Sequence, residues 1–236
     1  MSDGQIEGWA QAFFEQQARL IESVLPFQPS VEAVLNEQND KSTVVITVDL
    51  SYAGSLVTAQ DEAECLSSGL YDLKVEYRTG LDRLDQFPTV LNSTFQIRAA
   101  GAPAIRFEYE RDKSSVPAAH IHVHGDGGLL SPGLMKNGKK GSRTGDWQNL
   151  HLPVGGHRFR PSLEDFLYFV INECGFRGRA EWEDTLLTSR VSWLDKQCAA
   201  ATRDAPDVAA EALRALGYQV TAPSSTDTDL GRHDGW

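Results

Sequence analysis

The sequence predicts an α+β fold, in which an antiparallel β-sheet is combined with an N-terminal helix and a C-terminal helical group. Three observations lead to this prediction. Apolar residues recur every three or four positions near the N-terminus, runs of alternating or β-branched residues separated by turns fill positions 31–125, and helical periodicity returns after position 161. The length of 236 residues fits one domain over 1–221 and a disordered tail over 222–236, which is rich in Ser, Thr and Asp.

The first predicted element is an amphipathic helix over 5–25 that ends at Pro26. Its apolar stripe includes Trp9, Phe13 and Ile21. Two β-branched runs, 31–37 and 43–52, then flank Asn39-Asp40, which predicts two strands joined by a turn. The residues between Gly54 and Gly69 form an acidic loop.

The central strands are predicted from alternation. Positions 72–78 alternate apolar and charged residues, and the stretch 79–92 is rich in turn formers. The runs 94–99 and 104–110 surround Gly101-Ala102-Pro103, and a further strand covers 119–125. The region 94–125 is therefore expected to be a core hairpin.

The chain after the last long strand is predicted to change character twice. Residues 126–147 are rich in glycine without periodicity and read as a flexible basic insertion, followed by a short strand over 149–154. Helices are then expected within 162–217. Ser162 is an N-cap with Asp165 as its capping partner, Gly175 ends the first helix, and two more helices cover 181–201 and 206–217.

Charge is distributed unevenly along the chain. The net charge of -11 argues against a uniformly basic nucleic-acid-binding protein. Residues 136–160, however, contain six basic and one acidic side chain, and five of the six histidines lie between positions 120 and 157. RNA or a nucleotide is therefore expected to bind only around this segment. The residues that would contact it are His124, Lys139, Lys140, Arg143, His157, Arg158 and Arg160.

Cysteine content and hydropathy limit the class of protein further. Cys65, Cys174 and Cys198 have no C-x-x-C spacing, so neither a disulfide framework nor a thiolate zinc cluster is expected. No apolar run reaches the roughly 18 residues that a membrane-spanning helix needs, and the first residues lack a basic stretch followed by an apolar core. We therefore expect a cytoplasmic protein without a membrane partner.

Three alternating histidines are the main functional signal. In a strand, residues two apart share a face, so His120, His122 and His124 should project away from the core, as should Arg106 and Glu108 on the preceding strand. An antiparallel hairpin would place Glu108 opposite His120 and Arg106 opposite His122. A carboxylate beside an imidazole orients it for acid–base chemistry, and an arginine binds phosphate.

A metal site is the other chemistry that this strand predicts. Adjacent histidines of the row lie about 6.6–6.8 Å apart at the backbone and can converge on one ion, whereas the outer two, about 13 Å apart, cannot easily do so. Zinc or another divalent metal would therefore be held by His120 and His122, or by His122 and His124, with a third ligand such as His151, His157 or Asp126. We place His151 in the candidate metal set.

Two family resemblances accompany these patterns. The run H-I-H-V-H at 120–124 resembles the histidine-triad motif of nucleotide hydrolases and transferases. More broadly, residues 94–175 are similar to the TumE-like toxins of bacterial toxin–antitoxin pairs. The similarity rests on R-F-E-Y-E (106–110), the histidine strand, L-P-V-G-G-H-R-F-R-P (152–161) and S-L-E-D-F-L-Y-F-V (162–170). This resemblance implies an active face formed by Arg106, Glu108, the histidine strand and Arg158 or Arg160, and it implies an antitoxin as protein partner.

The sequence thus favours a phosphodiester-directed hydrolase or nuclease of toxin–antitoxin or defence type. In it His120 or His122 acts as general acid or base, Glu108 orients that histidine, and Arg106 binds phosphate. Two alternatives stay open. One is a non-catalytic, metal-binding interaction module whose Trp9, Trp182 and Trp193 helices bind a partner of an operon-encoded complex. The other is a metal-dependent oxygenase or small-molecule hydrolase.

Overall fold

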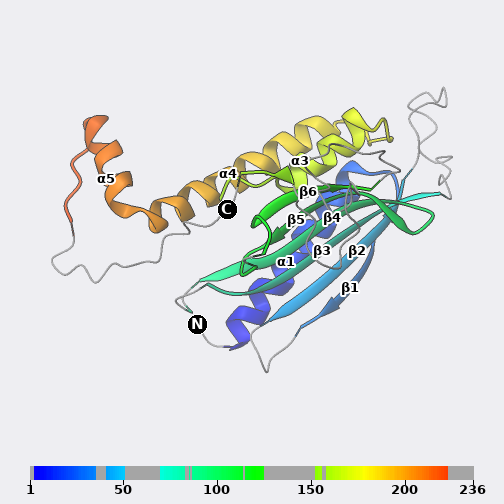
Figure 1. Cartoon of the computed structure of the whole chain (residues 1–236), viewed down its shortest axis with the longest axis horizontal. Coiled ribbons are helices and arrows are strands. Elements are labelled where there is room, and N and C mark those ends of the chain that lie inside the picture. The colour runs from blue at the N-terminus through cyan, green and yellow to red at the C-terminus, as the bar shows by residue number, and fades with distance from the viewer. Residues whose placement is uncertain are drawn as a thin grey trace, which may run out of the picture.

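The computed structural model confirms the α+β class (Figure 1). It describes residues 3–35, 41–50, 70–82, 85, 87–113, 115–124, 152–155 and 158–222. Within these ranges an N-terminal helix precedes a seven-stranded antiparallel sheet, and a group of helices follows it. The acidic loop 54–69, the turn at Asn39-Asp40, the insertion 126–147 and the tail beyond Ala222 lie outside the described residues.

The strands follow one another in the sheet in the order in which they occur in the chain, β1 to β7, and every neighbouring pair is antiparallel. The sheet is therefore a meander, in which each strand pairs with the strands that precede and follow it in the chain. The bounds of the strands are β1 Ser30–Val34, β2 Ser42–Asp49, β3 Tyr71–Leu81, β4 Pro88–Ala99, β5 Ala102–Glu110, β6 Ala119–Val123 and β7 Leu152–Pro153.

Strand β4 is longer than its sequence predicts. It begins at Pro88 rather than at position 94 and pairs with the end of β3, after a register shift between Arg78 and Thr79. The turn predicted over 79–92 was therefore wrong for 79–81, which continue β3, and for 88–92. The physical reason is Ser93, which is only 5% exposed and occupies a core-facing position between Leu91 and Phe95, so that a polar residue interrupts the apolar alternation.

The helices agree with their predicted starts and ends to within a few residues. They are α1 Asp3–Val24, α3 Leu163–Tyr168, the π-helical turn η3 Phe169–Glu173, α4 Trp182–Asp204 and α5 Pro206–Ala215. The predicted capping box is present, because the Asp165 amide donates to Ser162 Oγ and the Ser162 amide donates to the Asp165 carboxylate. Gly175, with φ +73°, follows η3 in a conformation that favours glycine.

The main core lies between one face of the sheet and the helices. Helix α1 packs against both α4 and the strands β2 to β4, and α3 packs against α4. Phe166 of α3 is completely buried, and its ring contacts those of Phe95 and Phe107. Because Phe107 of β5 points toward the helices, its neighbours Arg106 and Glu108 point to the other face, which we call the polar face.

Tyr77 predicts how stability depends on alkaline pH. Burial, together with the nearby Glu164 carboxylate, raises the pKa of Tyr77 well above its ordinary value, although Arg160 opposes this. Since the folded pKa exceeds the unfolded one of about 10, this stabilisation is complete below pH 10 and is lost as the pH rises toward the folded pKa. Above pH 10, Tyr77 should therefore make the unfolding free energy of the wild type fall by up to about 1.4 kcal/mol per pH unit. Tyr77→Phe should remove this part of the decline, as measured by urea unfolding at a series of pH values.

The hydroxyl of Tyr77 also donates to Gln17 Oε1 at 3.2 Å, so Tyr77→Phe should cost about 1 kcal/mol at pH 7. Tyr168→Phe provides the control, because Tyr168 is 41% exposed. Equal pH slopes for the wild type and Tyr77→Phe would contradict the prediction.

Helix α5 extends away from the sheet beyond the end of α4 (Figure 1). None of its described residues is buried, and Val208 is 60% exposed. In urea unfolding, a chain that ends at Ala205 should therefore have a free energy of unfolding within about 0.5 kcal/mol of that of the full chain. As a control, a chain that ends before Ala200, which is 7% exposed, should lose distinctly more stability. A large loss on removing α5 alone would mean that the helix packs against the domain.

Among the helices that the structure describes, none combines the length and the apolar composition needed to cross a bilayer.

Candidate metal centre

The register between β5 and β6 matches the prediction from sequence. Glu108 pairs with His120, and Arg106 pairs with His122. The polar side chains of the two strands consequently meet on the polar face, where the imidazoles of His120 and His122 lie with their ring centroids 4.9 Å apart. Residues two apart on one strand share a face, and their cross-strand partners Glu108 and Arg106 lie close enough to contact them.

The Glu108 carboxylate is shared by the two histidines. Its Oε2 lies 3.3 Å from His120 Nε2 and 3.0 Å from His122 Nε2. His120 is 1% exposed and His122 is 5% exposed, so both rings are withdrawn from solvent, while the Glu108 side chain retains 15% exposure. Three potential ligand atoms thus converge at a buried point. Of the three side chains, that of Glu108 is the most exposed.

A backbone carbonyl sets the orientation of His120. Its Nδ1 lies 2.7 Å from the oxygen of Pro117, and because a carbonyl only accepts hydrogen bonds, Nδ1 carries the proton. This leaves Nε2 directed at Glu108. A histidine that donates one ring N–H to a backbone carbonyl and presents the other nitrogen to a shared point has the arrangement usual for a metal ligand.

The electrostatics of Glu108 favour its charged form. Burial by itself would raise the pKa of this carboxyl, but hydrogen bonds from His120 and His122 and the positive charge of Arg106 together hold the pKa well below its usual range. The carboxylate is therefore ionised at neutral pH, as both a metal ligand and an imidazole partner must be.

Two buried nitrogens of the polar face, on Arg106 and His124, make no aligned hydrogen bond within the described ranges. Arg106 Nε is 3.1 Å from Glu108 Oε1, which makes an ion pair, but its N–H does not point correctly for a hydrogen bond, and His124 Nε2 is likewise buried without a partner. Burial and the charges of Arg106 and His122 lower the pKa of His124, so its ring is neutral at pH 7. Buried polar atoms in this state are satisfied by water or by a ligand.

The three side chains of Glu108, His120 and His122, called the His–Glu cluster below, fit a divalent metal. Their ligand atoms all lie within 4.8 Å of one another. A tetrahedral ion with bonds of about 2.0–2.1 Å separates its ligand atoms by about 3.3 Å, close to the 3.0 and 3.3 Å found from Glu108 Oε2 to the two imidazoles. Two histidines and one carboxylate leave at least one coordination position open, as in catalytic sites.

His124 does not belong to this cluster. Its ring lies 6.1 Å from that of His122, and its backbone amide donates to Ala104 at the end of the β5–β6 ladder. The sequence left His122 and His124 open as a metal pair, but the ligand atoms that converge among the described residues are those of Glu108, His120 and His122.

Several predicted site residues lie elsewhere. Lys139, Lys140, Arg143, His151 and His157, with Asp126, are outside the described residues. Arg158 and Arg160 are not brought to the His–Glu cluster. Arg158 pairs with Asp204 of α4, and Arg160 stacks on Tyr109, whose side chain faces the helices. The two arginines therefore lie on the side of β5 opposite to Glu108.

No family model, curated protein or solved structure matches the chain. The site must accordingly be interpreted from its own geometry.

Two features of the site were missed from sequence. Glu108 was predicted to orient a histidine, whereas its carboxylate also lies within reach of both imidazoles as a candidate metal ligand. The alternation of 105–109 against 119–123 contained that signal, because it places Glu108 opposite His120. The Pro117 carbonyl contact had no signal in the sequence, since any residue carries a backbone carbonyl.

Proposed function

We propose that the chain binds a divalent transition metal at Glu108, His120 and His122 and hydrolyses a phosphate ester there. The observation that carries the proposal is the single carboxylate shared by two buried imidazoles, with Arg106 Nε 3.1 Å from its other oxygen. When bound, the metal would lower the pKa of a coordinated water and so supply a hydroxide nucleophile at neutral pH.

The remaining residues of the polar face have distinct roles in this proposal. Arg106, whose side chain is 28% exposed, meets an incoming phosphate and neutralises its charge. His124, on the same face, is the residue that we propose exchanges a proton with the leaving oxygen, because its Nε2 has no hydrogen-bond partner among the described residues. The burial of His120 and His122 keeps them from direct contact with a large substrate, so the reacting group must approach from the side of Glu108 and Arg106.

A second candidate is metal-independent acid–base hydrolysis. The direct His122–Glu108 distance of 3.0 Å favours it, because this is a hydrogen bond that orients a general acid or base without any ion. Here the carboxylate holds His122 and Arg106 binds phosphate, as in the mechanism expected from sequence.

Metal analysis combined with a hydrolysis assay separates the two. The purified chain is stripped with a chelator, titrated with Zn²⁺, Mn²⁺ and Fe²⁺ by calorimetry, and assayed on bis(p-nitrophenyl) phosphate and on a short single-stranded RNA. Saturable binding of one ion per chain together with metal-dependent hydrolysis supports the first proposal. Hydrolysis that survives chelation supports the second. Neither binding nor hydrolysis would overturn both, and iron-dependent oxygen consumption would favour an oxygenase.

The cellular setting expected from sequence belongs to this proposal. An RNA substrate, a cytoplasmic location and an antitoxin partner rest on the resemblance of residues 94–175 to TumE-like proteins and on the basic segment 136–160. Expression of the chain in a bacterial host tests this setting. Growth arrest by the wild type and normal growth with His122→Ala are expected, and equal growth would reject the toxin interpretation.

A further inference from the structure

A cavity of about 680 Å³ lies between α1, α4 and the helix-covered face of β3 to β5. None of the three residues of the His–Glu cluster lines it, since they occupy the polar face. Its size falls within the range of sites for small organic molecules. Exposed residues at its border, including Ser192 and Lys196 of α4, make it accessible from solvent.

Cationic side chains outnumber anionic ones in the lining. Among the described residues the cavity is bordered by five cations and three carboxylates, although the whole chain carries a net charge of -11. A partly enclosed space with an excess of one charge attracts ligands of the opposite sign. The cations are Arg111, Arg158, Arg160, Lys196 and Arg203, and the carboxylates are Asp82, Glu164 and Asp204.

The arginines at one end are held in place by their neighbours. Arg158 makes a two-pronged ion pair with Asp204, with Nη2 2.8 Å from Oδ1, and the Arg160 guanidinium lies 3.8 Å from the centre of the Tyr109 ring. Arg111 is 8% exposed. Burial lowers the pKa of Arg160, and the charges of Arg158 and Arg111 add to this effect, whereas Tyr109 and Tyr77 oppose it.

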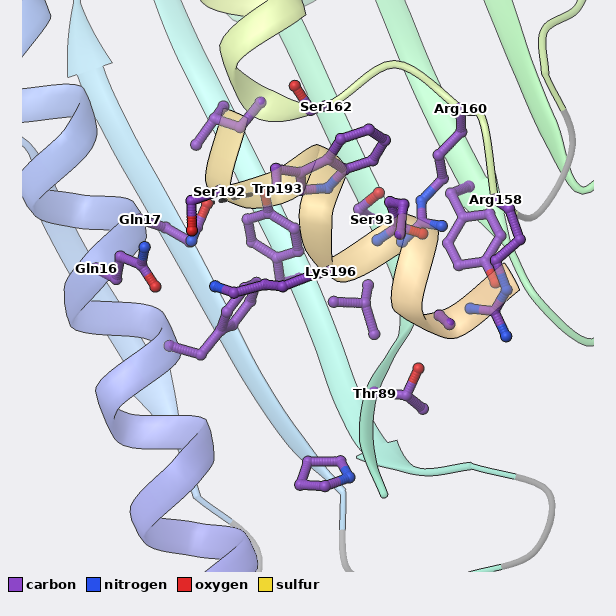
Figure 2. A pocket seen from close by; sticks show the side chains of 18 of the residues that line it. Gln16, Gln17, Thr89, Ser93, Arg158, Arg160, Ser162, Ser192, Trp193 and Lys196 are labelled. Carbon is purple, nitrogen blue, oxygen red and sulfur yellow. Dashed lines mark hydrogen bonds between the residues drawn. The ribbon is translucent and has the colours of Figure 1, made fainter. Parts of the chain in front are cut away.

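The rest of the lining supplies flat apolar surface and an oxygen that lacks a partner. Figure 2 shows Trp193 and Lys196 of α4 between Arg158 and Arg160 on one side and Gln16 and Gln17 of α1 on the other. The rings of Trp9, Phe13 and Tyr77 also line the cavity. Gln197 Oε1 is buried without a hydrogen bond in the described part of the chain, and such an acceptor is normally satisfied by a donor such as water.

We infer that this cavity binds a small organic anion with a flat apolar body, of the class of aromatic carboxylates. The carboxylate would lie at Arg158 and Arg160, and the ring would pack against Trp193 and Phe13. The Lys196 side chain points toward Gln16 at the other end of the cavity (Figure 2). This ligand site is separate from the proposed hydrolytic centre and does not depend on it.

Calorimetry with 2-naphthoate tests the inference, with 2-naphthylmethanol as a probe that has the same ring system without the charge. The full chain should bind one naphthoate saturably and the alcohol at least about tenfold more weakly. Arg158→Met should weaken naphthoate binding about tenfold, whereas Lys196→Met, at the other end of the cavity, should change it less than about threefold. Lys196 is exposed, so its variant tests the charge without disturbing the core.

Lys113→Met is the matched control, because Lys113 pairs with Glu110 and does not line the cavity. It should bind naphthoate like the wild type, as should Glu108→Gln, which disables the proposed metal centre only. Absence of saturable naphthoate binding would overturn the inference. Equal affinity for the alcohol and the carboxylate, or unchanged affinity in Arg158→Met, would do the same.

Discussion

Replacing Glu108 by glutamine should weaken metal binding at least about 100-fold and reduce metal-dependent hydrolysis to background. Glutamine keeps the size of the side chain but removes the negative charge that two imidazoles and Arg106 surround. A divalent cation at this point would then face the positive charge of Arg106 without a compensating carboxylate. Calorimetric titration of the chelated protein and analysis of bound metal both measure this loss.

Glu110→Gln is the control for this experiment. Glu110 lies two residues further along β5 on the same face, but it pairs with Lys113 and not with the histidines. Its replacement should leave metal affinity within about twofold of the wild type, since the ion pair is at the surface. Equal metal affinity for Glu108→Gln and the wild type would show that the cluster is not the metal site.

Replacing Phe166 by alanine should lower the free energy of unfolding by about 3–5 kcal/mol. Phe166 is completely buried, and its ring lies 5.0 to 6.3 Å from those of Phe95, Phe107 and Phe169, measured between ring centres. Its removal therefore leaves a cavity where α3 meets β4 and β5. Urea unfolding monitored by circular dichroism measures the change.

Tyr168→Ala removes an aromatic ring from the same helix, but that ring is 41% exposed and contacts only Trp182 among the described aromatic rings. This variant should lower the free energy of unfolding distinctly less than Phe166→Ala does. A loss below about 1 kcal/mol for Phe166→Ala would mean that α3 does not anchor the helices to the sheet. Phe166→Leu, which retains much of the volume, should lie between the two.

The parts of the fold that could be predicted are those with regular periodicity. Alternation over 105–109 and 119–123 was sufficient to obtain the pairing of Glu108 with His120, because a shift by one residue would have turned Phe107 out of the core. The capping box at Ser162 was equally predictable, since it depends on two residues three positions apart.

Irregular segments could not be predicted in the same way. Arg158 and Arg160 follow the two-residue strand β7, and no periodic pattern determines which face of the sheet such residues approach. They were expected beside the histidines, but they line the cavity on the other side of β5. Ser93 and the π-helical turn η3 were missed for a related reason. Neither a buried serine nor a single wide helical turn produces a recognisable pattern of apolar residues.

Strand β5 contributes to both proposed sites, with Arg106 and Glu108 on one face and Tyr109 on the other. This alternation constrains how the gene can change. A point substitution affects one site and leaves the other intact, whereas insertion or deletion of one codon within 106–109 exchanges the faces of every following side chain in the strand. Natural variation in this segment should therefore consist of substitutions, with length changes confined to the connections before Ala102 and after Glu110.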